Sequence, residues 1–102
     1  MVKTEQFRTM ALSFPGTFEY QHFNRRAFKS KRIFVTLNEE ERDANFLFTP
    51  DEQEEFCNLL PDFIKPLSNK WGEKGATQFL LDHVPEEIIW SGLEVAYKTS
   101  ML

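Results

Sequence analysis

Residues 32–55 read RIFVTLNEEERDANFLFTPDEQEE, and this stretch contains the local signals that decide the fold. Residues 32–37 are rich in β-branched and aromatic side chains, which is typical of a strand. The polar residues 38–43 form a loop, and the Phe-rich residues 44–48 form a second strand. Because the connection is short, the two strands are expected to pair antiparallel.

The end of the same stretch predicts the start of a helix. Thr49 can cap it, Pro50 lies where its missing N–H costs no hydrogen bond, and Glu52 completes a capping box. Apolar residues then recur at helical spacing, from Phe56 to Phe63. We therefore expect a helix that runs to about residue 60.

The segments before this stretch extend the sheet. Residues 4–13 have the apolar spacing of a helix, which Pro15 and Gly16 end. Residues 17–23 and 26–29 predict two strands, so that four strands form a meander with short connections.

The segments after it complete the domain. Residues 61–75 contain two prolines and two glycines and are predicted to be a long loop. Residues 76–81 predict a fifth strand, and a last helix follows to about Thr99. The sequence thus predicts an α+β fold in the order α-β-β-β-β-α-β-α, as a single domain over residues 1–102.

Composition limits the functional classes. The chain has 102 residues, a formal net charge of −4 and eleven phenylalanines. A negative protein is poorly attracted to nucleic acid or to an anionic membrane by its overall field. Its one cysteine, Cys57, excludes an intrachain disulfide and favours a reducing compartment. No apolar run is long enough for a membrane span. We expect a cytoplasmic protein, and we expect it to be a monomer.

The order of motifs resembles a known family. A helix ends in LSFPG (12–16), and Glu19 with His22–Phe23 precedes FKSKRIF (28–34). A loop with Trp71–Gly72 and a last helix with Tyr97 follow. This pattern is similar to the MmcQ/YjbR family of small bacterial proteins and spans nearly the whole chain.

The resemblance implies a CyaY-like fold, an antiparallel sheet backed by helices. Family members are commonly labelled as proposed DNA-binding proteins, and no catalytic residue can be transferred from them. The chain departs from the family at Ser30–Lys31, where glycines are usual at the hairpin turn, and at Ala96, where a serine often precedes the tyrosine. Without glycine, a two-residue primed turn is strained, so we expect a longer or a strained loop.

A basic hairpin is the first candidate site. It combines five of the twelve Lys and Arg residues, which are Arg25, Arg26, Lys29, Lys31 and Arg32. One hypothesis is DNA binding, because a two-stranded ribbon fits a groove and these cations can neutralise phosphates. The favoured alternative is that the charges protect a sheet edge in water while Phe23, Phe28 and Phe34 belong to the core.

The loop SNKWGEKG (68–75) is the second candidate site, with Lys70, Trp71 and Lys74 as a partner surface. Trp71 either contacts bases or a protein partner or folds back over the core, and folding back is favoured. If Trp71 and the basic hairpin share one face, each strengthens the case for the other.

The other candidate residues indicate neither a catalytic site nor a metal site. The acidic run Glu39–Glu41 lacks calcium-loop spacing, and His22 is interpreted as a half-buried, hydrogen-bonded histidine. We expect no enzymatic activity, no cofactor and no metal. The functional hypothesis is weak DNA binding through the hairpin. Its alternative is a protein-interaction or small-ligand module that uses Trp71 and the concave sheet face.

Overall fold

A computed structural model describes residues 1–102. Six strands form one antiparallel sheet in the order β1-β2-β3-β4-β6-β5. The strands are β1 (Phe18–His22), β2 (Arg25–Lys29), β3 (Ile33–Asn38), β4 (Asp43–Leu47), β5 (Ile64–Pro66) and β6 (Ala76–Leu80). The helices are α1 (Thr4–Leu12), α2 (Pro50–Leu59), α3 (Lys70–Glu73) and α4 (Glu86–Ser100), with a 3-10 turn at Leu81–His83.

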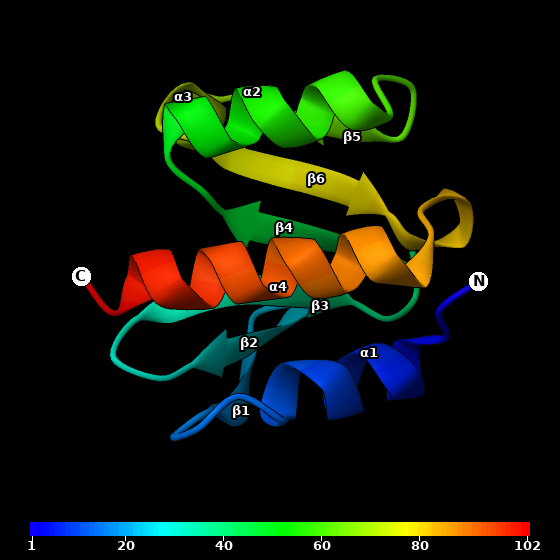
Figure 1. The fold of residues 1–102 in the computed structure, drawn as a ribbon. Helices are drawn as coiled ribbons and strands as arrows, with labels where there is room; N and C mark the ends of the chain where they lie inside the picture. The colour runs from blue at the N-terminus through cyan, green and yellow to red at the C-terminus, as the bar shows by residue number, and fades with distance from the viewer.

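The three long helices cover one face of the sheet. Figure 1 shows α1 in front of β1 and β2, α4 across β3 and β4, and α2 beside β5 and β6. The opposite face has no helix of comparable length over it, and only the short α3 lies at its rim. None of the helices combines the length and apolar composition needed to cross a membrane.

A layer of phenylalanine rings joins the helices to the sheet. Phe46 of β4 stacks on Phe79 of β6, with 4.0 Å between the ring centroids. Phe7 of α1 meets Phe46 edge to face at 6.1 Å, and Phe56 of α2 stacks on Phe48 at 4.8 Å. Such pairs add about 0.5–1.5 kcal/mol each to the burial of the rings.

Helix α4 approaches this layer closely because it presents a glycine. A Cβ on Gly92 would lie 3.0 Å from the Phe46 ring and 3.1 Å from the Phe79 ring. The neighbouring residues Ile89, Leu93 and Ala96 are fully buried, as their spacing predicts. The last helix therefore packs its backbone directly on the central aromatic pair.

The predicted capping box of α2 is confirmed. The Glu52 N–H donates to Thr49 Oγ1 at 3.2 Å, and the Thr49 N–H donates to Glu52 Oε1 at 2.9 Å. The hydroxyl of Thr99, in the last turn of α4, donates to both carboxylate oxygens of Glu52. The same carboxylate thus caps α2 and fixes the end of α4.

The hairpin between β2 and β3 uses a longer loop, as the lack of glycine predicts. Residues 30–32 connect the strands without a positive φ. Ile33 pairs with Lys29 whereas Val35 pairs with Phe28, so Phe34 is an extra residue on β3. This bulge lets Phe34 and Val35 both be fully buried.

The predicted α+β class and the order of the main elements are confirmed, with a different strand count. The segment predicted as a long loop contains β5 and α3. Strand β5 has only three residues and ends at Pro66, where a missing N–H is tolerated because the strand lies at the sheet edge. Its brevity and the surrounding prolines conceal it in the sequence.

Helix α3 is held in place by contacts with the Leu67 backbone and with a side chain of α2. A Cβ on Gly72 would lie 1.7 Å from the Leu67 carbonyl oxygen, so only glycine fits. The Gln53 side chain of α2 donates to the carbonyls of Gly72 and Ala76 at 2.9 and 3.0 Å. The loop that contains Trp71 is therefore fixed in place by its backbone.

The close contact between Gly72 and the Leu67 backbone gives the first prediction. Gly72→Ala should lower the free energy of unfolding by about 1–3 kcal/mol, because the new methyl must displace the Leu67 backbone. Lys70→Ala in the same helical turn, an exposed position, should change it by less than about 0.5 kcal/mol. Urea denaturation followed by circular dichroism measures both, and equal stabilities of the two variants would contradict the close contact.

Candidate functional site on the open sheet face

The uncovered face of the sheet is defined by the pairing register. We call it the open face. Residues directly opposite one another share a face, and a continuous row crosses all six strands. From β1 to β5 the row contains Tyr20, Ala27, Thr36, Asn45, Gln78 and Lys65. The row places an aromatic ring at one edge, amides in the centre and a cation at the other edge.

A cavity of about 330 Å³ opens on this face. Five of the six strands contribute to it, along with Leu67, which follows β5, and the first turn of α3. The lining residues are His22, Arg25, Ile33, Thr36, Asn45, Leu47, Leu67, Trp71 and Ala76. The structure thus brings Arg25 of the basic hairpin and Trp71 of the 68–75 loop to one site, 46 positions apart in the chain.

Arg25 of β2 lines the cavity, and its side chain is held by residues of β3 and β4. Its Nη2 lies 2.8 Å from Asp43 Oδ1, and its Nε donates to Thr36 Oγ1 at 2.9 Å. The side chains of Arg25 and Asp43 are only 19% and 11% exposed. This ion pair neutralises the arginine, so Arg25 is a fixed hydrogen-bonding group more than a free phosphate contact.

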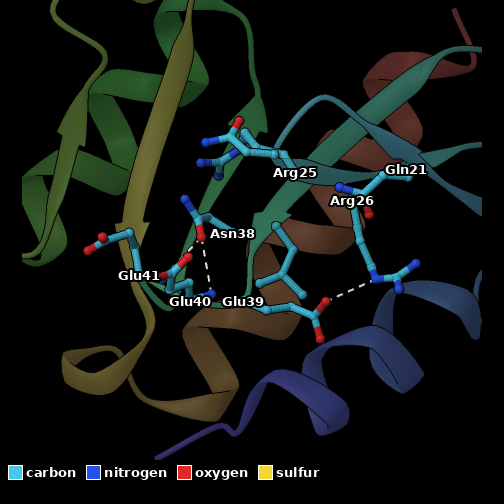
Figure 2. A pocket seen from close by; sticks show the side chains of 9 residues that line it. Gln21, Arg25, Arg26, Asn38, Glu39, Glu40 and Glu41 are labelled. Carbon is cyan, nitrogen blue, oxygen red and sulfur yellow. Dashed lines mark hydrogen bonds and ion pairs between the residues drawn. The ribbon is translucent and has the colours of Figure 1, made fainter.

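Arg26 points to the opposite side of the sheet, as adjacent strand residues must. Figure 2 shows its guanidinium extending to Glu39, away from that of Arg25, at a polar hollow of about 270 Å³ that both arginines line. Its Nε lies 2.9 Å from Glu39 Oε1, and Nη1 lies 3.6 Å from Glu19 Oε2. Arg8 of α1 also binds Glu19, at 2.9 Å. Arg26 therefore helps to attach α1 to the sheet.

The five basic residues of the hairpin do not share one exposed face. Arg25 and Arg26 are each paired with carboxylates on opposite sides. Lys29, Lys31 and Arg32 form no ion pair within the protein. Lys29 lies opposite Phe18 and Ile33 in the register, which places it on the open face. Three of the five cations remain free for a ligand.

Trp71 is exposed, and the prediction that it folds back over the core is wrong. Its side chain is 62% exposed even though its backbone is fixed. Asn69 Oδ1 accepts the N–H groups of Trp71 and Gly72 at 3.0 and 3.2 Å, which caps α3. Lys74 Nζ lies 5.4 Å from the indole centroid, within cation–π distance. The predicted set of Lys70, Trp71 and Lys74 thus forms one short helical turn and its end.

Asn45 lines the cavity, and its side-chain oxygen has no partner in the protein. Its Oδ1 is inaccessible and accepts no hydrogen bond, and neither amide atom bonds to another residue. A buried amide oxygen without a donor costs about 1–3 kcal/mol. Sequence reasoning missed Asn45, because its isolation depends on the register of three strands.

The charge on the open face differs from the charge of the whole chain. Among the strand residues that face this way, Asp43 is the one carboxylate, and Arg25 neutralises it. Lys29 and Lys65 face the same way without ion pairs. Most acidic residues lie instead on α1, α2, α4 and the 38–43 turn. The negative net charge therefore does not describe this surface.

The aromatic residues at the β1 edge are more exposed than the sequence predicts. Phe28 and Phe34 are buried as predicted, but Phe23 is 87% exposed and has a φ of 57° in the β1–β2 turn. His22 is exposed, not half-buried, and its ring lies 4.8 Å from that of Phe23. Phe18 is 52% exposed beside Tyr20. These rings extend the aromatic surface from the cavity to the sheet edge.

The remaining reactive groups form no site. Burial raises the pKa of the Cys57 thiol, which disfavours the thiolate. Nowhere do three or more His, Cys, Asp or Glu side chains gather so that they could hold a metal ion.

Comparison with known proteins places the chain in a family. The family model for YjbR matches residues 12–99. The chain belongs to the YjbR family. This match confirms the family resemblance seen in the order of the sequence motifs, and it covers every strand and the helices after α1.

Solved structures agree on the fold of this YjbR-family chain. The crystal structure of Deinococcus radiodurans protein DR2400, with the domain description DUF419, superimposes with a TM-score of 0.81. The two chains are 20% identical, and the match covers 95% of this chain and 77% of that one. At this identity the likeness shows the fold alone. No curated protein sequence matches the chain.

The two arginine pairs of the YjbR-family hairpin give a second prediction. Asp43→Asn should lower the free energy of unfolding by about 1.5–3 kcal/mol, because a hydrogen bond to a charged, mostly buried group is lost. Glu39→Gln should lower it by less than about 1 kcal/mol, since its partner is more exposed. Denaturant titrations measure the free energy of unfolding of both variants. An equal decrease in the two would show that the Arg25–Asp43 pair stabilises the protein no more than the Arg26–Glu39 pair does.

Proposed function

We propose that this protein binds single-stranded nucleic acid, weakly and without catalysis, through the open face of its sheet. The observation that carries the proposal is that the fixed, exposed Trp71 and the hairpin residue Arg25 line one cavity. Proteins that bind single strands combine aromatic platforms for bases with cations that follow the backbone. Both components are present on this face.

The aromatic component is spread over the width of the sheet. Trp71 lies at one side of the cavity, and Tyr20, His22 and Phe18 follow on β1. Stacking of a base on such a ring contributes about 1–3 kcal/mol and tolerates any sequence. A duplex hides its base faces, so this surface favours unpaired strands.

The cationic component lies beside the aromatic one. Lys29 shares the open face, and Lys31 and Arg32 lie in the turn that follows β2. Lys70 and Lys74 flank Trp71 on α3. Figure 1 shows the β2–β3 turn and α3 toward the same end of the sheet. A strand that stacks on Trp71 can therefore bring its phosphates to these cations.

A second candidate function is binding of a protein segment at the edge of the sheet. Strand β1 is an edge strand. Phe18, its first residue, and Phe23, which follows it, are 52% and 87% exposed. Edge strands of this kind accept an added strand from a partner. This function uses the β1 edge and does not require Trp71, which separates it from nucleic-acid binding.

Fluorescence anisotropy tests the proposal. A labelled eight-nucleotide single strand should bind more tightly than the duplex of the same sequence. With Lys29, Lys31, Arg32, Lys70 and Lys74 as the phosphate contacts, log affinity against log salt should have a slope of about −3.5 for single strands. Reversal of the charges of Lys29, Lys31 and Arg32 should flatten the slope.

Matched variants locate the surface. Trp71→Ala should weaken single-strand binding by about tenfold or more, as expected for the loss of one stacked base. Leu59→Ala removes another exposed apolar side chain, 56% exposed on α2, and should leave binding unchanged. Absence of binding at low salt, or an equal affinity for duplex, would overturn the proposal.

A further inference from the structure

We infer that the cavity on the open face is a subsite for one unpaired nucleobase, recognised by its hydrogen-bonding edge. This inference rests on the proposed function and specifies which chemical group enters the cavity. Trp71 provides the stacking wall, and the Asn45 amide together with Arg25 Nη1 provides the polar contacts.

The size and the lining of the cavity suit a planar ring. Its volume of about 330 Å³ is at the small end of ligand sites. Ile33, Leu47, Leu67 and Ala76 supply apolar walls, so a phosphate or a sugar gains little there. A heteroaromatic base has the apolar faces and the polar edge that such a site requires.

The Asn45 amide supplies the first polar contact. Its Oδ1 is buried and has no donor within the protein, so the inference includes a turn of the amide about its Cβ–Cγ bond that brings this oxygen to an entering base. An amide offers one acceptor and one donor group side by side. The edge of adenine offers the complementary pair, an amino group beside a ring nitrogen.

Arg25 supplies the second polar contact. Its Nε and Nη2 are used by Thr36 and Asp43, while Nη1 makes no bond within the protein. The ion pair with Asp43 fixes the guanidinium plane. A fixed donor beside a free amide discriminates between base edges because a base with the wrong edge leaves buried polar groups unpaired.

The test uses paired ligands that differ in one amino group. Labelled octamers of deoxyadenosine and of purine deoxyriboside, which lacks the amino group, are titrated into the wild-type protein and Asn45→Ala. We expect the adenine octamer to bind the wild type about fivefold more tightly, as for one hydrogen bond of about 1 kcal/mol. Asn45→Ala should bind both octamers equally.

Two further ligands test whether the base is required and whether it must belong to a strand. An abasic octamer retains every phosphate but has no base, and it should bind the wild type more weakly than the adenine octamer does. Adenosine monophosphate should compete with the adenine octamer if the subsite accepts free nucleotides, and fail to compete if the subsite requires a strand. Either result with adenosine monophosphate leaves base recognition in place and decides its source.

The outcomes distinguish failure of single-strand binding from failure of the base subsite. Binding of no oligonucleotide overturns the proposed function itself. Binding in which abasic and adenine octamers are equal overturns the base subsite but keeps single-strand binding through phosphates. Equal binding of adenine and purine octamers to wild type overturns the role of Asn45, and this comparison needs no variant that must fold. Stability of Asn45→Ala is checked by urea denaturation.

Discussion

The stack of Phe46 on Phe79 is the contact on which the rest of the structure depends. These rings lie side by side on neighbouring strands, and α1 and α4 pack directly on them while α2 reaches Phe79 through Phe56. Since apolar burial is the main favourable term in folding, all three long helices collect on that side of the sheet. The other side remains open, and its residues are available to a ligand.

Hydrogen bonds between strands fix part of the polar lining of the cavity. Arg25 joins β2 to β3 and β4 through Thr36 and Asp43, which leaves Asn45 beside them unpaired. The short helix α3 adds Trp71 at the rim because Gly72 allows its backbone to touch Leu67. The site is thus held by strand register and by one glycine contact, both of which are rigid features.

Much of the fold could be predicted from local signals in the sequence. The capping box at Thr49 and the β-branched run at residues 33–37 correspond to real elements, and the glycine-free turn after β2 has the expected longer loop. Strand β5 could not be predicted, because three residues that end in a proline have no periodicity to detect. The bulge at Phe34 was equally hidden, since it depends on pairing with β2.

The site was predictable in part. The sequence identified Arg25 and Trp71 as candidates, and both line the cavity, whereas Arg26 of the same hairpin pairs with Glu39 on the other side of the sheet. The pairing of Arg25 with Asp43 and of Arg26 with Glu39 could not be read from the chain, because it joins residues 18 and 13 positions apart. Asn45 was missed because an unpaired amide is visible only once every neighbour is placed.

Nuclear magnetic resonance with the two tryptophans as reporters tests the central claim most directly. Trp71 lies on the open face and Trp90 on α4, against Phe14. On titration with a single-stranded adenine octamer, the indole N–H signal of Trp71 and the side-chain amide signals of Asn45 should shift, while the Trp90 indole signal stays in place. A shift at Trp90 with no change at Trp71 would contradict the account.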